Sequence, residues 1–312
     1  MRIARIKMNF CGALVCTMLS GGMLSIHLFN RLWRVRAFVL PLLLPSLLVL
    51  LLPVRVQAAY VDKADLTGDL IVELASDPAQ DFVIQRDALY DMGVKTEAVY
   101  IPYLDRHIQC TVLPLSALLE QYPEFDAAFA YCYDGYISYY TSVFIEEYDP
   151  YVVLDFEGNE KGDMQLDGAP DMGPFYITFA KQLTAGSQEL LDPANKRPFG
   201  VYKLKLGTKQ SLVGPLFEAP FDTMDASAQA GREIWMNNCM SCHSWDPVGP
   251  GGNLSNRIVK IVSMHAKYNK QYFHDFVKDP QVTMPDSKMP KHPHYSDETI
   301  EQIRQFLTHV PN

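Results

Sequence analysis

Residues 226–243 read ASAQAGREIWMNNCMSCH, and this stretch decides the fold of the C-terminal part of the chain. Small and apolar side chains recur in it at Ala228, Gly231, Trp235 and Cys239. These positions, spaced i, i+3, i+7 and i+11, share one face of a helix with about 3.6 residues per turn. The stretch therefore predicts a helix over residues 226–238 that ends at two cysteines and a histidine.

Cys239, Cys242 and His243 form a Cys-x-x-Cys-His motif, which is typical of covalent attachment of a c-type haem. Two thiols separated by two residues match the spacing of the haem vinyl groups, and the adjacent histidine supplies an axial nitrogen to the iron. A Cys-x-x-Cys pair by itself would also suit a redox dithiol or half of a zinc site. Because no second cysteine pair completes a zinc site, the motif favours haem.

A second helix is predicted over residues 297–309. Ser296 can cap it, and Asp297 suits the positive end of the helix dipole. The apolar stripe of this helix consists of Ile300, Ile303, Phe306, Leu307 and Val310. Since Gly231 has no side chain, we expect the two helices to approach closely there, with Trp235 packed against Phe306.

With these features, residues 226–309 resemble a class I cytochrome c domain. Three further segments carry the resemblance: Val248-Gly249-Pro250, residues 272–280 (YFHDFVKDP) and Ser287-Lys288-Met289-Pro290. The resemblance implies one covalent haem c, and a Pro250 carbonyl that accepts a hydrogen bond from the haem-ligating histidine. The segment Gly251-Gly252-Asn253 departs from the family pattern.

The second axial ligand decides what the iron can do. Methionine gives a six-coordinate iron with a raised reduction potential, whereas an open position permits oxygen or peroxide chemistry. Met289 and Met284 are each followed by proline, and the resemblance favours Met289, with Met284 as the alternative. Histidine is a further option, and the candidates are His265, His274, His292 and His294.

Residues 1–58 are interpreted as a secretory signal peptide. An uncharged apolar run over residues 37–52 follows three arginines and precedes Val56-Gln57-Ala58, a pattern that suits cleavage after Ala58. The alternative is an uncleaved membrane anchor, which would leave the domains on the same side of the membrane. Met23 could be the true first residue, because a weaker apolar stretch precedes the basic region. The pattern predicts a periplasmic protein, secreted across the inner membrane.

Residues 60–206 predict an α+β domain with a mixed or antiparallel sheet. Residues 114–121 suit a short helix, and a linker over residues 207–224 precedes the cytochrome c domain, residues 225–312. The runs with strand composition are residues 70–74, 136–140, 151–154, 175–179 and 202–206. The sequence of this domain shows no combination of residues that is typical of a catalytic site, so no catalytic residue is assigned.

Parts of this domain also resemble the sulfite oxidase-type molybdopterin-binding fold, namely Leu113-Pro114-Leu115, Asp134-Gly135-Tyr136 and Gly173-Pro174-Phe175. The enzymes of that family place one cysteine on molybdenum. Cys110 or Cys132 could be proposed, but neither lies in the enzymes' ligand sequence. Cys11 and Cys16 lie in the leader, and Cys239 and Cys242 belong to the haem motif. Cys110 and Cys132 therefore remain, either as a disulfide or as two buried free thiols.

The charge of the chain is concentrated in its middle. Residues 60–220 hold 11 basic and 26 acidic side chains, a net charge of −15, whereas residues 221–312 hold 9 and 10. Such an acidic block repels nucleic-acid phosphates and an anionic pterin, but it can steer a basic redox partner.

The sequence therefore favours a periplasmic single-electron carrier, or the cytochrome subunit of a respiratory or dehydrogenase complex, with a cofactor-free acidic docking domain. The expected partner is a redox protein, either a basic cytochrome or a dehydrogenase, and contact with a membrane requires an uncleaved leader. One alternative is a molybdopterin-dependent oxidoreductase with a fused haem relay. Another is a sensor or assembly protein in which the haem is structural.

Overall fold

A computed structural model describes residues 61–181, 191–245, 249–255 and 257–311. Residues Val56–Asn312 form one compact unit. The predicted leader with Cys11 and Cys16, and also Val248, lie outside the described residues. Within these described ranges, no helix combines the length and the apolar character needed to cross a bilayer.

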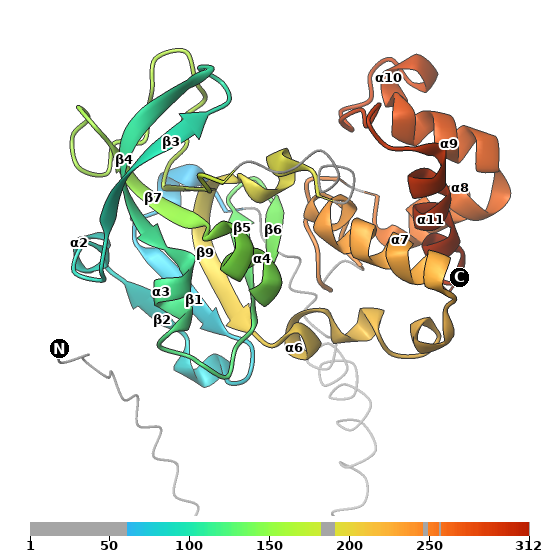
Figure 1. Cartoon of the computed structure of the whole chain (residues 1–312), viewed down its shortest axis with the longest axis horizontal. Coiled ribbons are helices and arrows are strands. Elements are labelled where there is room, and N and C mark those ends of the chain that lie inside the picture. Colours follow the sequence, from blue (N-terminus) through green and yellow to red (C-terminus); the bar gives the residue numbers. More distant parts are fainter. Residues whose placement is uncertain (1–60, 182–190, 246–248, 256, 312) are drawn as a thin grey trace, which may run out of the picture. The chain divides into compact units, whose positions relative to one another are not determined.

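The N-terminal part of the described chain contains one nine-stranded mixed sheet (Figure 1). Its strands are β1 (Leu70–Leu74), β2 (Phe82–Ile84), β3 (Lys95–Ile101), β4 (Arg106–Pro114), β5 (Ala127–Cys132), β6 (Ile137–Thr141), β7 (Tyr151–Phe156), β8 (Phe175–Thr178) and β9 (Phe199–Gly207). They follow the order β2-β1-β9-β8-β7-β4-β3, and β5 pairs with both β6 and β9. β1 and β9 run parallel, whereas the other pairs are antiparallel. The predicted mixed sheet is thus confirmed.

The five predicted strand runs coincide with β1, β6, β7, β8 and β9, whereas β2 to β5 were not predicted from the sequence. The first four residues of β3 and the first four of β4 are largely exposed and mostly polar, and the buried positions lie in the remainder of each strand. A strand of this kind gives a weak hydrophobic signal, because alternation is clear only where one face is covered. The short helices of this part are α2 (Arg86–Leu89), α3 (Leu115–Leu119) and α4 (Ser142–Tyr148), and α3 is shorter than predicted.

The two faces of the sheet bury separate apolar clusters, which settles the state of two cysteines. Along β7, Val152 faces one cluster and Val153 the other, as the alternation of a strand requires. Cys132 belongs to the first cluster and Cys110 to the second, with exposed fractions of 4% and 1%. Both are free thiols, so the prediction of a disulfide between them is wrong and the alternative of two buried free thiols is confirmed. A disulfide had been suggested because these two cysteines remain once the leader and the haem motif are set aside. The two side chains, however, lie on opposite faces of the sheet.

The C-terminal part is helical, with α7 and α11 as its central pair (Figure 1). Its helices are α6 (Lys209–Val213), α7 (Ala226–Asn237), α8 (Val259–Tyr268), α9 (Lys270–Lys278), α10 (Pro280–Thr283) and α11 (Asp297–Thr308). Both long predicted helices are confirmed. A Cβ atom at Gly231 would lie 1.9 Å from the carbonyl oxygen of Gln302, so only glycine permits this helix crossing. Trp235 contacts Phe306 with ring centroids 6.2 Å apart, as expected.

The hairpin of β5 and β6 shares a core with the helical part. Ala128 faces the interior of the sheet domain, whereas Phe129 faces the cluster that also contains Trp235, Met236 and Met240. The outer face of this hairpin therefore covers the helix that leads into the Cys-x-x-Cys-His motif.

Candidate haem site

A short 3-10 turn, Cys239–Ser241, carries the motif immediately after α7. The amides of Cys242 and His243 donate to the carbonyl oxygen of Cys239, over 3.2 and 3.0 Å. Both cysteines are half-buried, and Met240 between them is buried in the shared core. The turn thus holds the two sulfurs and the imidazole within one hydrogen-bonded loop.

His243 has the orientation expected of a metal ligand. Its Nδ1 lies 2.7 Å from the carbonyl oxygen of Arg257. Since a carbonyl only accepts, Nδ1 must carry the proton, and this leaves the lone pair of Nε2 for a metal. A ligating histidine in a protein almost always donates its other ring N–H in this way, which fixes the tautomer and raises the basicity of the ligand.

The prediction that Pro250 would accept this bond is wrong. The carbonyl of Pro250 accepts from the amide of Trp245 instead, over 2.7 Å. The loop turns back at Gly251, whose φ is 115° and where a Cβ would lie 2.7 Å from the Cα of Ser244. The carbonyl that faces the histidine is therefore that of Arg257, further along the chain.

Burial also sets the ionisation of the motif. Burial is the main factor that raises the pKa values of Cys239 and Cys242 to about 12. Burial likewise lowers the pKa of His243, the largest influence on that group. The site therefore favours neutral thiols and a neutral imidazole, the form in which histidine binds a metal.

Met289 and Met284 have different environments. Met289 is half-buried and packs against the cluster that contains Trp235 and Met240. Met284 is 37% exposed. The Nε2 of Gln281 donates to the carbonyl oxygen of Met289 over 2.8 Å and so holds this loop. Met289 thus packs against the same cluster as Cys239, and Met284 does not belong to that group.

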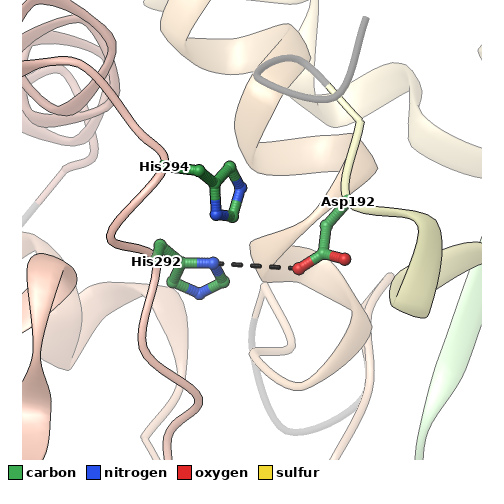
Figure 2. Close-up of side chains that lie close together, drawn as sticks. All are labelled: Asp192, His292 and His294. Carbon is green, nitrogen blue, oxygen red and sulfur yellow. Dashed lines mark ion pairs between the residues drawn. The ribbon is translucent and has the colours of Figure 1, made fainter. Parts of the chain in front are cut away.

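The four candidate histidines have other contacts. His265 lies 3.4 Å from Nη1 of Arg257 and packs near Tyr272. His274 bonds to Asp275 and Asp297, each over 3.0 Å. His292 and His294 face Asp192 (Figure 2).

The residues present fit a covalently held haem. The donor set of two thiols, an oriented imidazole and a thioether is the set that c-type haem requires. The surrounding cluster is apolar, and the hydroxyl of Tyr295, near Cys239, is buried without a hydrogen-bond partner among the described residues.

Comparison with known proteins identifies this part of the chain. Residues 226–307 match the family model described as "Cytochrome C oxidase, cbb3-type, subunit III". This is a cytochrome c domain. Such a domain carries haem and has a role in electron transfer. A comparison of the chain with curated proteins found no match.

Some contacts of the cytochrome c domain could not be found from the sequence. The amide of Asn253 donates to the carbonyl of Gly135 over 2.7 Å, and a Cβ at Gly252 would lie 1.9 Å from the carbonyl of Ser241. Like the Arg257 carbonyl, these partners are backbone atoms that every residue type supplies. The only sequence signal was the unexpected Gly251-Gly252-Asn253 itself.

Proposed function

We propose that the chain is a periplasmic c-type cytochrome that transfers single electrons, as a carrier or as a subunit of a respiratory or dehydrogenase complex. One haem c is held by Cys239 and Cys242, with His243 and Met289 as axial ligands. The observation that carries this proposal is the 2.7 Å contact from His243 Nδ1 to the Arg257 carbonyl, which leaves Nε2 for the iron. Met289, which packs against the apolar cluster that Cys239 also contacts, is proposed as the second ligand.

When bound, haem supplies the one-electron couple. The protein fixes its position and its potential. The Arg257 carbonyl orients His243, and Gln281 holds the loop of Met289. The apolar surroundings limit water at the site, and both the thioether ligand and low polarity raise the reduction potential. If His243 and Met289 both hold the iron, the domain would relay electrons and would leave no place for a substrate on the iron.

The N-terminal domain is proposed to dock a basic redox partner. Four exposed carboxylates lie in the loop between β7 and β8, namely Glu157, Glu160, Asp163 and Asp167. They contribute to the net charge of −15 on residues 60–220. A surface of one sign raises the association rate of an oppositely charged partner. The β5–β6 hairpin of the same domain packs on the segment that leads into the Cys-x-x-Cys-His motif.

The sulfite oxidase-like assignment of the N-terminal domain is part of the proposal, with the domain as a docking module without cofactor. Its two cysteines support this, because each is buried in an apolar cluster and neither offers a sulfur at the surface. Burial raises the pKa of Cys110 to about 12 and that of Cys132 well above its usual value, which disfavours the thiolate that a metal needs. Stoichiometric molybdenum in the purified protein would contradict this assignment.

The test is an optical comparison of two methionine variants of the haem-loaded protein. Met289→Ala should remove the sulfur-to-iron charge-transfer band and lower the reduction potential, because the iron loses its thioether ligand. Met284→Ala, a matched loss of an exposed methionine, should leave both unchanged. Reduction by a basic cytochrome in stopped flow should slow as ionic strength rises. A band that persists in Met289→Ala would refute the ligand assignment, and a salt-independent rate would refute the docking role.

A further inference from the structure

Three side chains outside the haem motif converge at one place (Figure 2). Asp192 precedes the 3-10 helix η3 (Pro193–Lys196), and His292 and His294 follow the Met289 loop. One ligand atom from each lies within 4.8 Å of the other two. In the part of the chain that the structure describes, no other group of three histidine, cysteine or acidic residues has this spacing.

Asp192 is fixed with one oxygen directed at the histidines. Its Oδ1 accepts from the amide of Ala194 over 2.9 Å, and its own amide donates to Oδ1 of Asn238 over 2.8 Å. Its other oxygen, Oδ2, lies 3.9 Å from Nδ1 of His292. This distance is within ion-pair range but too long for a hydrogen bond, so the two groups face each other without a hydrogen bond (Figure 2).

His292 is buried, at 6% exposure, and its Nδ1 has no hydrogen-bond partner among the described residues. The ring cannot easily turn away, because it stacks on Tyr295 with centroids 4.9 Å apart and an interplanar angle of 6°. Its backbone amide donates to the carbonyls of Val277 and Lys278, each over 3.2 Å. A buried polar nitrogen without a partner costs folding free energy, and such a group requires an explanation.

His294 completes the group from the solvent side. It is exposed, and its ring packs edge-on against Tyr295 at 4.6 Å. Tyr295 therefore contacts both imidazoles, one on its face and one at an angle. The buried ligand is held rigidly, whereas the exposed one is able to rotate towards a bound ion.

We infer that Asp192, His292 and His294 form a binding site for a divalent transition-metal ion of the zinc and copper class. Imidazole nitrogen with carboxylate oxygen is a ligand set for Zn²⁺ and Cu²⁺, whereas Mg²⁺ and Ca²⁺ require oxygen ligands. Two ligands at about 2.1 Å from a metal lie at most about 4.2 Å apart. The 3.9 Å between Asp192 and His292 meets this limit, and rotation of His294 closes the remainder. Burial, the main influence, lowers the pKa of His292 and favours the neutral ring that binds a metal.

This site is separate from the proposed haem ligands but next to their attachment. Asn238, which holds Asp192, immediately precedes Cys239. Whether Met289 binds the haem iron does not affect this inference, because the test measures binding of an added metal ion to the haem-loaded protein.

The test is calorimetric titration of Zn²⁺ into the full-length, haem-loaded protein after removal of metals with a chelator. One equivalent should bind. Loss of a residue that only supports a metal ligand typically weakens metal affinity by about 10–100-fold. His294→Ala removes a ligand itself, so it should weaken Zn²⁺ binding by at least about ten-fold. His294 is exposed, so its removal leaves the fold intact, and an unchanged haem spectrum checks this. His274→Ala is the matched control, because His274 also contacts two carboxylates, Asp275 and Asp297. Its affinity for Zn²⁺ should equal that of the parent protein.

One equivalent of Cu²⁺ in place of Zn²⁺ should give an electron paramagnetic resonance spectrum with nitrogen coupling that His294→Ala reduces. The inference is overturned if no stoichiometric ion binds. It is also overturned if His294→Ala binds Zn²⁺ as tightly as the parent, or if His274→Ala loses as much affinity as His294→Ala.

Discussion

Gly231→Ala tests the crossing of α7 and α11, and α7 leads directly into the Cys-x-x-Cys-His motif. The added Cβ would lie 1.9 Å from the carbonyl oxygen of Gln302 and 2.8 Å from the amide nitrogen of Ile303. Real Cβ contacts essentially never fall below 3.0 Å, so α7 and α11 must separate by about an ångström. Both obstructing atoms belong to the backbone of α11, and neither can rotate away as a side chain would.

The expected net loss of stability is about 2 kcal/mol. Overpacking a core costs typically about 1–3 kcal/mol, and a backbone obstruction belongs at the upper end. Alanine recovers about 1 kcal/mol through its better helix propensity. For a unit of this size, about 2 kcal/mol corresponds to a fall in Tm of about 4–8 °C.

The assay is chemical and thermal unfolding of the haem-loaded protein, followed by far-ultraviolet circular dichroism. Ser227→Ala on the same helix is the control, since it adds no atom and alanine has the better helix propensity. That variant should match or slightly exceed the parent in stability. If Gly231→Ala were as stable as the parent, the close crossing of α7 and α11 would be refuted.

Two further predictions concern ionisable groups. Lys196 is 1% exposed and donates to the Tyr139 carbonyl and to Asn237, and burial lowers its pKa to about 7. Between about pH 7 and pH 10.5 the unfolded chain therefore binds more protons at this residue than the folded chain, and stability rises with pH. Lys196→Met should lack this contribution, so urea unfolding at several pH values should show the parent gaining stability relative to the variant as pH rises, and a constant difference would contradict the assignment. Hydrogen bonding from Arg304 is the main factor that lowers the pKa of Glu301 to about 2, so its stabilising contribution is present above about pH 4.5 and is lost as pH falls through about 2. Glu301→Gln should therefore lose less stability than the parent on acidification through that window, and equal acid sensitivity of the two proteins would count against the Glu301–Arg304 pair.

Local patterns in the sequence predicted the cytochrome c domain. Helix periodicity placed α7 and α11 nearly to the residue, and the glycine at position 231 predicted their close approach. These features are readable because each depends on neighbours within a few turns of one helix. The Cys-x-x-Cys-His motif is equally local, because its chemistry is set by the spacing of adjacent residues.

In the N-terminal domain, the sequence predicted strands and a mixed sheet but missed four of the nine described strands. It also left Cys110 and Cys132 open between a bridge and two free thiols. That choice depends on which face of the sheet each residue occupies, and strand pairing over long sequence separations decides it.

The sequence by itself predicted that Cys239, Cys242 and His243 form a haem-attachment motif, and it determined their place at the end of a helix. Only the tertiary structure decided that the Arg257 carbonyl, and not Pro250, orients His243, and that Met289 is packed while Met284 is exposed. It alone brought Asp192 to His292 and His294 across about a hundred residues of chain. The physical reason is the same in each case: backbone carbonyls carry no residue-specific signal, and burial and long-range contacts exist only after the chain has folded.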